Sequence, residues 1–358
     1  MTQTKNRRGA QRRVHGWWIA IASLMATGTP MTWAQTCTPT NLGGFPGARF
    51  SDGSFGFQSH LKVNPDGGKA SYTLGDHGYT YISNGVSKRS WGTWTSCEPL
   101  AANCGNLFKE AEVGAFGPGT QEFCAFALEV EPIPPKTATQ ECGKGRKIIG
   151  NGKGRPILGS DQLDTVDGKK TRYYKSMTHL NQWIDGKALS VDSITIPMIV
   201  VPTGNGEMLG RIAYVSHGGK STFAVVGDTG PNLGEGSIAL HELLRYGELQ
   251  TPPPIGPIKI EDRCGPVEKG VKPPYSVRPD VRNDICKSNQ KMRGAADIRG
   301  YANIPNGVTT IVLGKARLPM RSATVVGETI TLNSIKKAFD DAGYTTEILN
   351  RMARCLSP

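Results

Sequence analysis

Two acidic residues, Asp228 and Glu235, stand a short segment apart in a stretch that is otherwise apolar or rich in glycine. Two carboxyl groups that face each other across a cleft are typical of glycoside hydrolysis. One of them protonates the leaving oxygen, while the other activates water or attacks the sugar. The same acids could also be solvated residues of a surface loop, with Asp228 shaping a turn. The elements that position them decide between these interpretations.

The residues around the two acids predict a rigid setting. Residues 223–226 are apolar and rich in β-branched side chains, which is typical of a buried strand, and Asp228 follows this strand. The segment GDTGP indicates a turn. After Glu235, Ser237 opens an apolar pattern at helical spacing, which predicts a helix. Apolar surroundings raise a carboxyl pKa and a helix N-terminus lowers it, so this order favours Asp228 as the acid and Glu235 as the base.

The segments VVGDTGP and LGEGS resemble the signature of the fungal-type chitosanases, glycoside hydrolase family seventy-five. In that family an apolar strand runs into a GD-T/S-x-G turn, a GEAS-like segment follows, and the two essential carboxylates match Asp228 and Glu235. Gly236 stands where alanine is usual, and the loop between the acids is shorter than the family's. The resemblance implies an endo-acting enzyme that cleaves β-1,4 linkages in chitosan and inverts the anomeric configuration.

Other segments extend this resemblance over residues 45–90 and 171–325. The turn NPDGG contains Asp66, which matches an acid in the family's opening segment, and IPMIVVP and VTTIVL are similar to two of its strands. The resemblance implies a compact double-psi-like β-barrel with short helices.

The composition agrees with a β-rich fold, all-β to α+β, because 45 glycines and 24 prolines among 358 residues favour loops and strands over a helical bundle. We expect a single domain over residues 35–358. Its core would be interrupted by disulfide-clipped insertions at 91–170 and 251–300 and followed by a helical tail at 331–358.

Residues 1–34 predict a signal peptide. Basic residues without any acid precede a mostly apolar stretch at 17–33, and Thr32-Trp33-Ala34 is an acceptable cleavage site. We therefore expect cleavage near Ala34 and a secreted or periplasmic protein without a stable membrane anchor. The alternative is that the segment is retained as an anchor.

All eight cysteines follow this segment, and an even number in an exported chain predicts disulfide bonds. We expect one bridge between Cys264 and Cys286 and a clip within residues 97–142. No CxxC or paired Cys/His spacing is present, and the six histidines are isolated in the sequence, which favours packing or surface positions. The sequence therefore predicts no metal site and no cofactor.

Four further residues are candidates for substrate binding: Asp66, Asp192, Trp91 and Trp94. The tryptophans could stack on sugar rings, because the apolar face of a sugar packs on an aromatic surface. Each candidate has a purely structural alternative. Asp66 would form a turn, Asp192 would be a surface acid at the start of a strand, and the tryptophans would be buried beneath the insertion.

The formal net charge of +12 includes five basic residues within positions 1–34 and no acid there, so the remainder carries 12 − 5 = +7. This moderate charge comes without a nucleic-acid motif, so we expect no nucleic-acid partner. The expected partner is a polysaccharide, chitosan or a related amino-sugar polymer, bound by a monomer. Two alternatives remain open: a peptidoglycan-directed glycosidase, which a basic surface would suit, and a non-catalytic, disulfide-braced carbohydrate-binding protein.

Overall fold

The computed structural model describes residues 37–42, 44–76, 78–79, 82–97, 101–143, 145–252, 255–256, 268–269, 287–288 and 303–356. Within this part, strands that are far apart in the sequence pair with each other. The predicted signal peptide, its cleavage near Ala34 and the predicted bridge between Cys264 and Cys286 lie outside the described residues.

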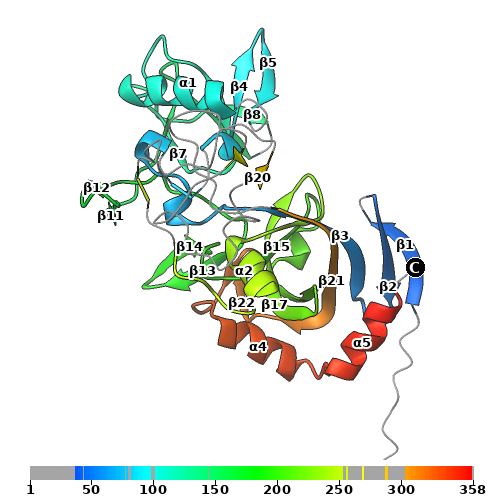
Figure 1. Cartoon of the computed structure of the whole chain (residues 1–358). Helices are drawn as coiled ribbons and strands as arrows, with labels where there is room; N and C mark the ends of the chain where they lie inside the picture. Colours follow the sequence, from blue (N-terminus) through cyan, green and yellow to red (C-terminus); the bar gives the residue numbers. More distant parts are fainter. Residues whose placement is uncertain are drawn as a thin grey trace, which may run out of the picture. The chain divides into compact units, whose positions relative to one another are not determined.

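The strands around the central barrel are, in spatial order, β3 (Phe55–Val63), β18 (Glu235–Gly236), β15 (Met198–Pro202), β17 (Lys220–Gly230), β16 (Arg211–His217) and β21 (Ile304–Arg317). Because β21 also pairs with β3, these six strands close on themselves (Figure 1). β18 runs parallel to β3 and β17 runs parallel to β15, whereas the other pairs are antiparallel. The predicted β-rich fold with a compact barrel is confirmed.

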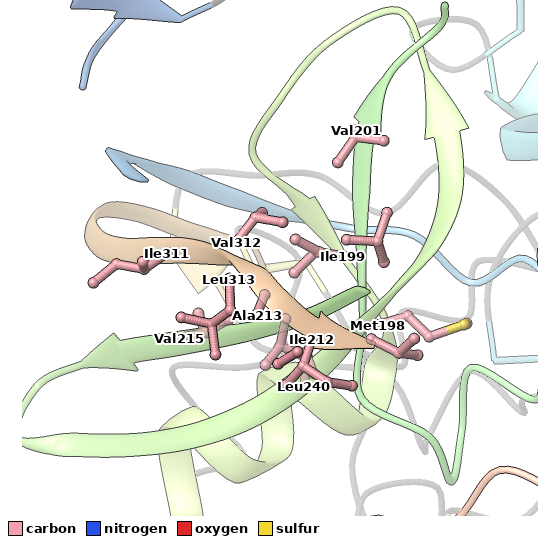
Figure 2. Close-up of a cluster of buried hydrophobic side chains, with 14 of the residues drawn as sticks. Met198, Ile199, Val201, Ile212, Ala213, Val215, Leu240, Ile311, Val312 and Leu313 are labelled. Atoms are coloured by element: carbon pink, nitrogen blue, oxygen red, sulfur yellow. The ribbon is translucent and has the colours of Figure 1, made fainter. Parts of the chain in front are cut away.

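Apolar and mostly β-branched side chains pack together within this barrel (Figure 2). Ile199 of β15, Ile212 of β16 and Val312 of β21 are all at most 2% exposed. Every residue of 198–201 is buried, which is typical of a strand covered on both faces. The predicted strand IPMIVVP therefore forms part of the core.

Helix α2 (Ile238–Tyr246) follows β18 directly. The Ser237 side chain caps it by accepting a hydrogen bond from the Leu240 N–H, and Gly247 ends it in the left-handed conformation with φ 85°. The helix start predicted at Ser237 is confirmed. Because Ser237 follows β18 without an intervening loop, the helix cap also fixes the end of that strand.

Two helices form the end of the described chain, α4 (Leu332–Asp341) and α5 (Thr346–Arg354). Thr331 and Ser334 form a reciprocal capping box at the start of α4, and Thr345 caps α5. Phe339 of α4 packs on Phe223 of β17 with ring centroids 4.1 Å apart. The helical pattern predicted for the tail therefore corresponds to two helices, of which α4 packs against the barrel.

A second hydrophobic cluster lies mostly in the segment that was expected to be an insertion, but it also includes flanking residues, Tyr72, Ile82, Val86 and Tyr174. Its sheet contains, in order, β5 (Thr93–Ser96), β4 (Val86–Ser90), β6 (Phe123–Ala125), β9 (Arg146–Ile149) and β8 (Glu141–Gly143), and it is accompanied by α1 (Ala101–Val113). Two disulfides, Cys97–Cys104 and Cys124–Cys142, brace it. The clip expected within residues 97–142 is confirmed.

The remaining strands pair in small sheets or extend the barrel. They are β1 (Cys37–Leu42) and β2 (Phe45–Phe50) beside β3, β7 (Val130–Glu131) with β10 (Arg155–Pro156), β11 (Leu163–Asp164) with β12 (Lys170–Thr171), β13 (Asn181–Ile184) with β14 (Lys187–Ser190), β22 (Met320–Ser322) and β23 (Val325–Val326), and β19 (Glu268–Lys269) with β20 (Lys287–Ser288). None of the helices that the structure describes is long and apolar enough to cross a membrane.

Cys37 in β1 and Cys355 after α5 carry free thiols, but these two side chains interact with each other. Burial, followed by the hydrogen bond with Cys37, raises the pKa of the Cys355 thiol to about 11. Two thiols in contact need only an oxidant to form a disulfide. We therefore expect oxidised protein to contain a Cys37–Cys355 bond, in line with the even cysteine count.

This bond would join the first described strand to the residue after the last helix, and closing so long a loop stabilises a folded chain by about 2–5 kcal/mol. Peptide mapping without reductant should find the linked pair, and Cys37→Ser should lower the melting temperature under oxidising conditions. As the control, the melting temperatures of Cys37→Ser and wild type are compared in a reductant that spares the other bridges. Equal melting of both proteins under oxidising conditions would contradict the prediction.

Candidate functional site

Asp228 lies near the end of β17, at a point where the parallel register with β15 shifts between Ile199 and Val200. Only 6% of the residue is exposed. Its Oδ1 accepts hydrogen bonds from the Thr229 N–H at 2.8 Å and the His179 N–H at 3.1 Å. These two backbone donors fix the orientation of the carboxyl group, as expected for an acid at the end of a core strand.

The His179 side chain also pairs with Asp228, through its ring Nδ1 and the same Oδ1. The segment that carries His179 is held in place because the Leu180 N–H donates to the Gly227 carbonyl oxygen at 2.9 Å. The hydrogen bond to Asp228 raises the pKa of His179, so the ring keeps its positive charge to a higher pH than an ordinary histidine. The ring is largely exposed, with 59% of the side chain accessible, and it covers one edge of the Asp228 carboxyl.

Asp66 lies in the turn that follows β3, beside the same site. Its Oδ1 accepts a hydrogen bond from the Tyr72 hydroxyl at 2.6 Å, and its N–H donates to Asn64 Oδ1 at 2.9 Å. Burial, together with the neighbouring charges of Asp228 and Glu235, raises the pKa of the Asp66 carboxyl to about 8, against the lowering effects of Tyr72 and His179. Asp66 therefore holds its proton at neutral pH.

Gly67, the next residue, allows this turn to lie close to the neighbouring backbone. Its φ is 84°, and a Cβ placed there would lie 1.9 Å from the Val191 carbonyl oxygen. Only glycine meets both conditions. The Gly67 N–H donates to Ser176 Oγ at 3.0 Å, so the turn is bonded to two other segments of the chain.

Glu235 occupies the first position of β18, opposite Lys62 of β3, and is partly buried. Its side chain points back toward the end of β17, because a Cβ placed at Gly230 would lie 3.8 Å from Glu235 Oε2. Gly234, with φ 82°, allows this reversal of the chain. Glu235 is thus on the same side of the barrel as the residues that follow Asp228.

Asn64 connects the three acids. Its N–H donates to the Gly236 carbonyl oxygen at 2.8 Å, its Oδ1 accepts the Asp66 N–H, and its Nδ2 lies 3.5 Å from Asp228 Oδ2. We name Asp66, Asp228 and Glu235 the acid cluster. The cluster contains a carboxyl that holds a proton next to other acids, which is the equipment for general acid and base catalysis. In the described residues, no group of histidine, cysteine and acidic side chains is arranged to hold a metal ion.

The other predicted residues lie elsewhere. The Asp192 carboxyl accepts hydrogen bonds from the Ile194 N–H at 3.0 Å and Thr195 Oγ1 at 3.1 Å, and it closes the turn before β15. Asp192 is not among the groups that shift the pKa of Asp66. Its neighbour Ser193 donates to the Pro65 carbonyl oxygen at 2.8 Å, so this turn supports the Asp66 turn from behind.

Trp91 and Trp94 belong to the β4–β5 hairpin, and among the residues described here neither interacts with the acid cluster. Trp91 is fully exposed, at 103%, so the alternative that it is buried is wrong. Trp94 is partly covered by the Arg89 guanidinium, which lies 5.7 Å from its ring centroid. Sequence reasoning missed Asn64, Tyr72 and His179, since no spacing in the sequence relates them to Asp228.

No protein-family model matches the chain, and no curated protein is significantly similar to it.

The raised pKa of Asp66 predicts how stability changes with pH. The carboxyl loses its proton near pH 3.8 in the unfolded chain but near pH 8 in the folded protein, so the folded state binds more protons between these values. Stability therefore falls as the pH rises from about 4 to about 8. Asp66→Asn cannot ionise, so it should remove this decline and be more stable than wild type at pH 8.5.

Urea unfolding at pH 5 and pH 8.5 measures the effect. Asp164→Asn, an exposed position on β11, is the matched control and should leave the pH dependence unchanged. If Asp66→Asn and wild type lose stability in parallel between the two pH values, the Asp66 carboxyl is not protonated in the folded protein.

Proposed function

We propose that this protein is an exported, endo-acting glycoside hydrolase that cleaves β-1,4 linkages in chitosan by an inverting mechanism. The observation that carries the proposal is the acid cluster, in which Asp66 holds a proton beside Asp228 and Glu235. An inverting glycosidase needs one protonated and one ionised carboxyl on opposite sides of the scissile bond. The sequence signature around Asp228 and Glu235 supports the same reaction class independently of this geometry.

In this proposal Asp66 is the acid. Asn64 bridges Asp66 and Asp228, and the neighbouring charge of Asp228 helps to keep the proton on Asp66. The Tyr72 hydroxyl donates to Asp66 Oδ1, which leaves Oδ2 as the atom that carries the proton. This proton passes to the glycosidic oxygen as the bond to the anomeric carbon breaks.

Glu235 acts as the base. It is partly exposed and enters the site from β18, whereas Asp228 enters from β17. The carboxylate takes a proton from water as that water attacks the anomeric carbon from the face opposite the leaving oxygen. Positive charge develops on the sugar ring in this step, and the buried Asp228 carboxyl, fixed by two backbone N–H donors, is suited to stabilise it.

We also propose that the barrel is of the double-psi kind. Six strands with two parallel pairings, β3 with β18 and β15 with β17, support this finer assignment. The pairing of β15 with β17 positions Asp228, and the pairing of β3 with β18 positions Glu235 beside the end of β3, where the Asp66 turn begins. The pairing of the barrel strands therefore determines how the acid cluster is assembled.

The charge of the acid cluster and the charge of the rest of the chain favour different substrates. A concentration of carboxyl groups suits the cationic sugar of chitosan, because opposite charge raises the local substrate concentration. The basic remainder of the chain favours the alternative of an anionic peptidoglycan. Product release from chitosan, chitin and peptidoglycan, measured side by side, decides between them, and the absence of release from all three would favour a non-catalytic carbohydrate-binding protein.

Asp66→Asn, Asp228→Asn and Glu235→Gln should each lower kcat on chitosan by about 10²- to 10⁴-fold, the usual effect of losing general acid or base assistance. Reducing-sugar assays measure the rates, and circular dichroism confirms folding. Asp340→Asn, a surface change on α4, is the control and should keep the wild-type rate. A folded variant of any of the three acids with a near-normal rate would remove that residue from the mechanism.

The first product should have the anomeric configuration opposite to that of the substrate linkage. An inverting site places the two carboxyl groups about 6.5–9.5 Å apart, with room for a water molecule, whereas a retaining site places them about 5–5.5 Å apart. Proton NMR spectra recorded during the first turnovers of a chitosan oligomer identify the anomer before it equilibrates. A retained configuration would instead make Glu235 or Asp228 a nucleophile.

A further inference from the structure

A groove of about 680 Å³ lies in the sheet that contains β4 and β5, and its lining does not include the acid cluster. It is bordered by the tip of the β4–β5 hairpin, by α1 and by the loops before β6 and after β9. We name it the hairpin groove. Its volume is within the usual range for sites that bind small ligands, about 300–1,000 Å³.

Trp91 is the most unusual residue of the hairpin groove. It is fully exposed, and it occupies the tip of a two-residue turn in which Trp91 has φ 49° and Gly92 has φ 83°. Two successive positive φ values are typical of the tight hairpin turn that best fits the twist of its strands. For a tryptophan this conformation is uncommon, and large apolar side chains without cover mark interaction sites. The turn therefore presents a rigid indole to solvent.

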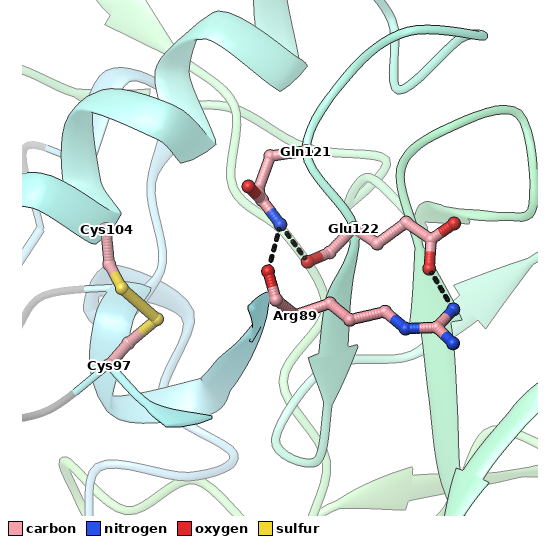
Figure 3. The surroundings of a disulfide bond; sticks show 5 residues. All are labelled: Arg89, Cys97, Cys104, Gln121 and Glu122. Carbon is pink, nitrogen blue, oxygen red and sulfur yellow. Dashed lines mark hydrogen bonds and ion pairs between the residues drawn. A yellow bond between two sulfur atoms is a disulfide. The ribbon is translucent and has the colours of Figure 1, made fainter. Parts of the chain in front are cut away.

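The wall of the groove is polar and internally fixed (Figure 3). Glu122 pairs with Arg89 at 2.8 Å and with Lys153 at 2.7 Å, and it accepts a hydrogen bond from Asn151 at 3.0 Å. The Gln121 side chain donates to the carbonyl oxygens of Arg89 and Glu122, both at 2.9 Å. The charges of Glu122 and Arg89 are therefore used within the protein.

Glu110 differs from these residues. It is an exposed residue of α1 that lines the same groove, and within the described chain it makes no ion pair. The hairpin groove thus combines one uncovered indole with one carboxylate that has no partner there. A bound phosphate would meet this negative charge, which disfavours nucleotides and nucleic acids. A cation is favoured twice, because both the carboxylate and the face of an indole attract it.

We propose that the hairpin groove binds an amino-sugar unit of a saccharide chain, with its apolar ring face on the Trp91 indole and its ammonium group at Glu110. The choice of sugar rests on the proposed function, whereas the site itself rests on the groove and its two residues. It would hold the polymer at a second point, so that the chain stays bound between successive cleavages.

The proposal is tested with Asp66→Asn protein, which leaves the saccharide uncleaved. Oligomers of glucosamine and of N-acetylglucosamine are titrated into it, and the indole N–H signal of Trp91 is followed by NMR together with the stoichiometry from calorimetry. We expect the Trp91 signal to move in a saturable way with the glucosamine oligomer. We also expect Trp91→Ala to remove one binding site per chain.

Glu110→Gln should weaken binding of the glucosamine oligomer at this site by about two- to fivefold, the usual effect of losing an exposed ion pair, while binding of the acetylated oligomer is unchanged. Trp183→Ala is the matched control, because Trp183 is packed against Arg321 at 4.0 Å and does not line the groove, so all sites should remain. An unmoved Trp91 signal, or unchanged stoichiometry in Trp91→Ala, overturns the site. The assignment to an amino sugar is overturned if wild type binds both oligomers equally well and Glu110→Gln does not change this binding.

These outcomes are separate from those that test hydrolysis. Binding at Trp91 by a protein that cleaves none of the polymers would support the hairpin groove and contradict the proposed enzyme. Cleavage of chitosan by a protein whose Trp91 signal never moves would do the reverse.

Discussion

The geometry of the site depends on the side chain and backbone of Asn64. Its N–H is bonded to the carbonyl oxygen that follows Glu235, its Oδ1 accepts the Asp66 N–H, and its Nδ2 approaches Asp228. A side-chain amide is one of the few groups that can both donate and accept in this way. An aspartate at this position would lack the donor and would add a further negative charge beside two carboxyl groups. Burial and the neighbouring charges of Asp228 and Glu235, which Asn64 helps to position, keep the proton on Asp66.

The register of the strands explains why the acids can meet. β17 follows the direction of β15 and β18 follows that of β3, whereas β18 runs antiparallel to β15. Asp228 lies beside Val200 and Gly236 lies beside Ile199, so β15 brings Asp228 and the residue after Glu235 to the same level of the barrel. The partner of Glu235, Lys62, is near the end of β3, just before the turn that carries Asp66. The buried run 198–201 is the apolar core on which this arrangement is built.

Local patterns in the sequence were sufficient to predict the elements whose structure is determined by local interactions. The strand before Asp228, the helix capped by Ser237 and the disulfides within residues 97–142 were all predicted, because β-branched runs, capping residues and cysteine spacing act over short distances. The partnership of His179 with Asp228 was not predicted, since it arises from a contact between segments 49 residues apart in the sequence.

For two of the candidate residues, residue type alone did not predict the environment of the side chain. Asp192 has the same chemistry as Asp66, yet its carboxyl is used by its own turn. Burial was one of two alternatives for Trp91, but the glycine after it permits a tight turn that directs the indole outward. Tryptophan followed by glycine between two short strands was the local signal for this hairpin.

The pairing of β3 with β21 has a consequence for the timing of folding. These strands lie near opposite ends of the described chain, and β3 is also the strand on which β18 and the Asp66 turn are placed. Contacts between such distant segments form late, because the intervening chain must first be brought together at a cost in loop entropy. A ribosome that has released β3 through β18 has made all three acids but not the strand that closes the barrel. The barrel that holds the acid cluster can therefore close only after the last barrel strand has been synthesised.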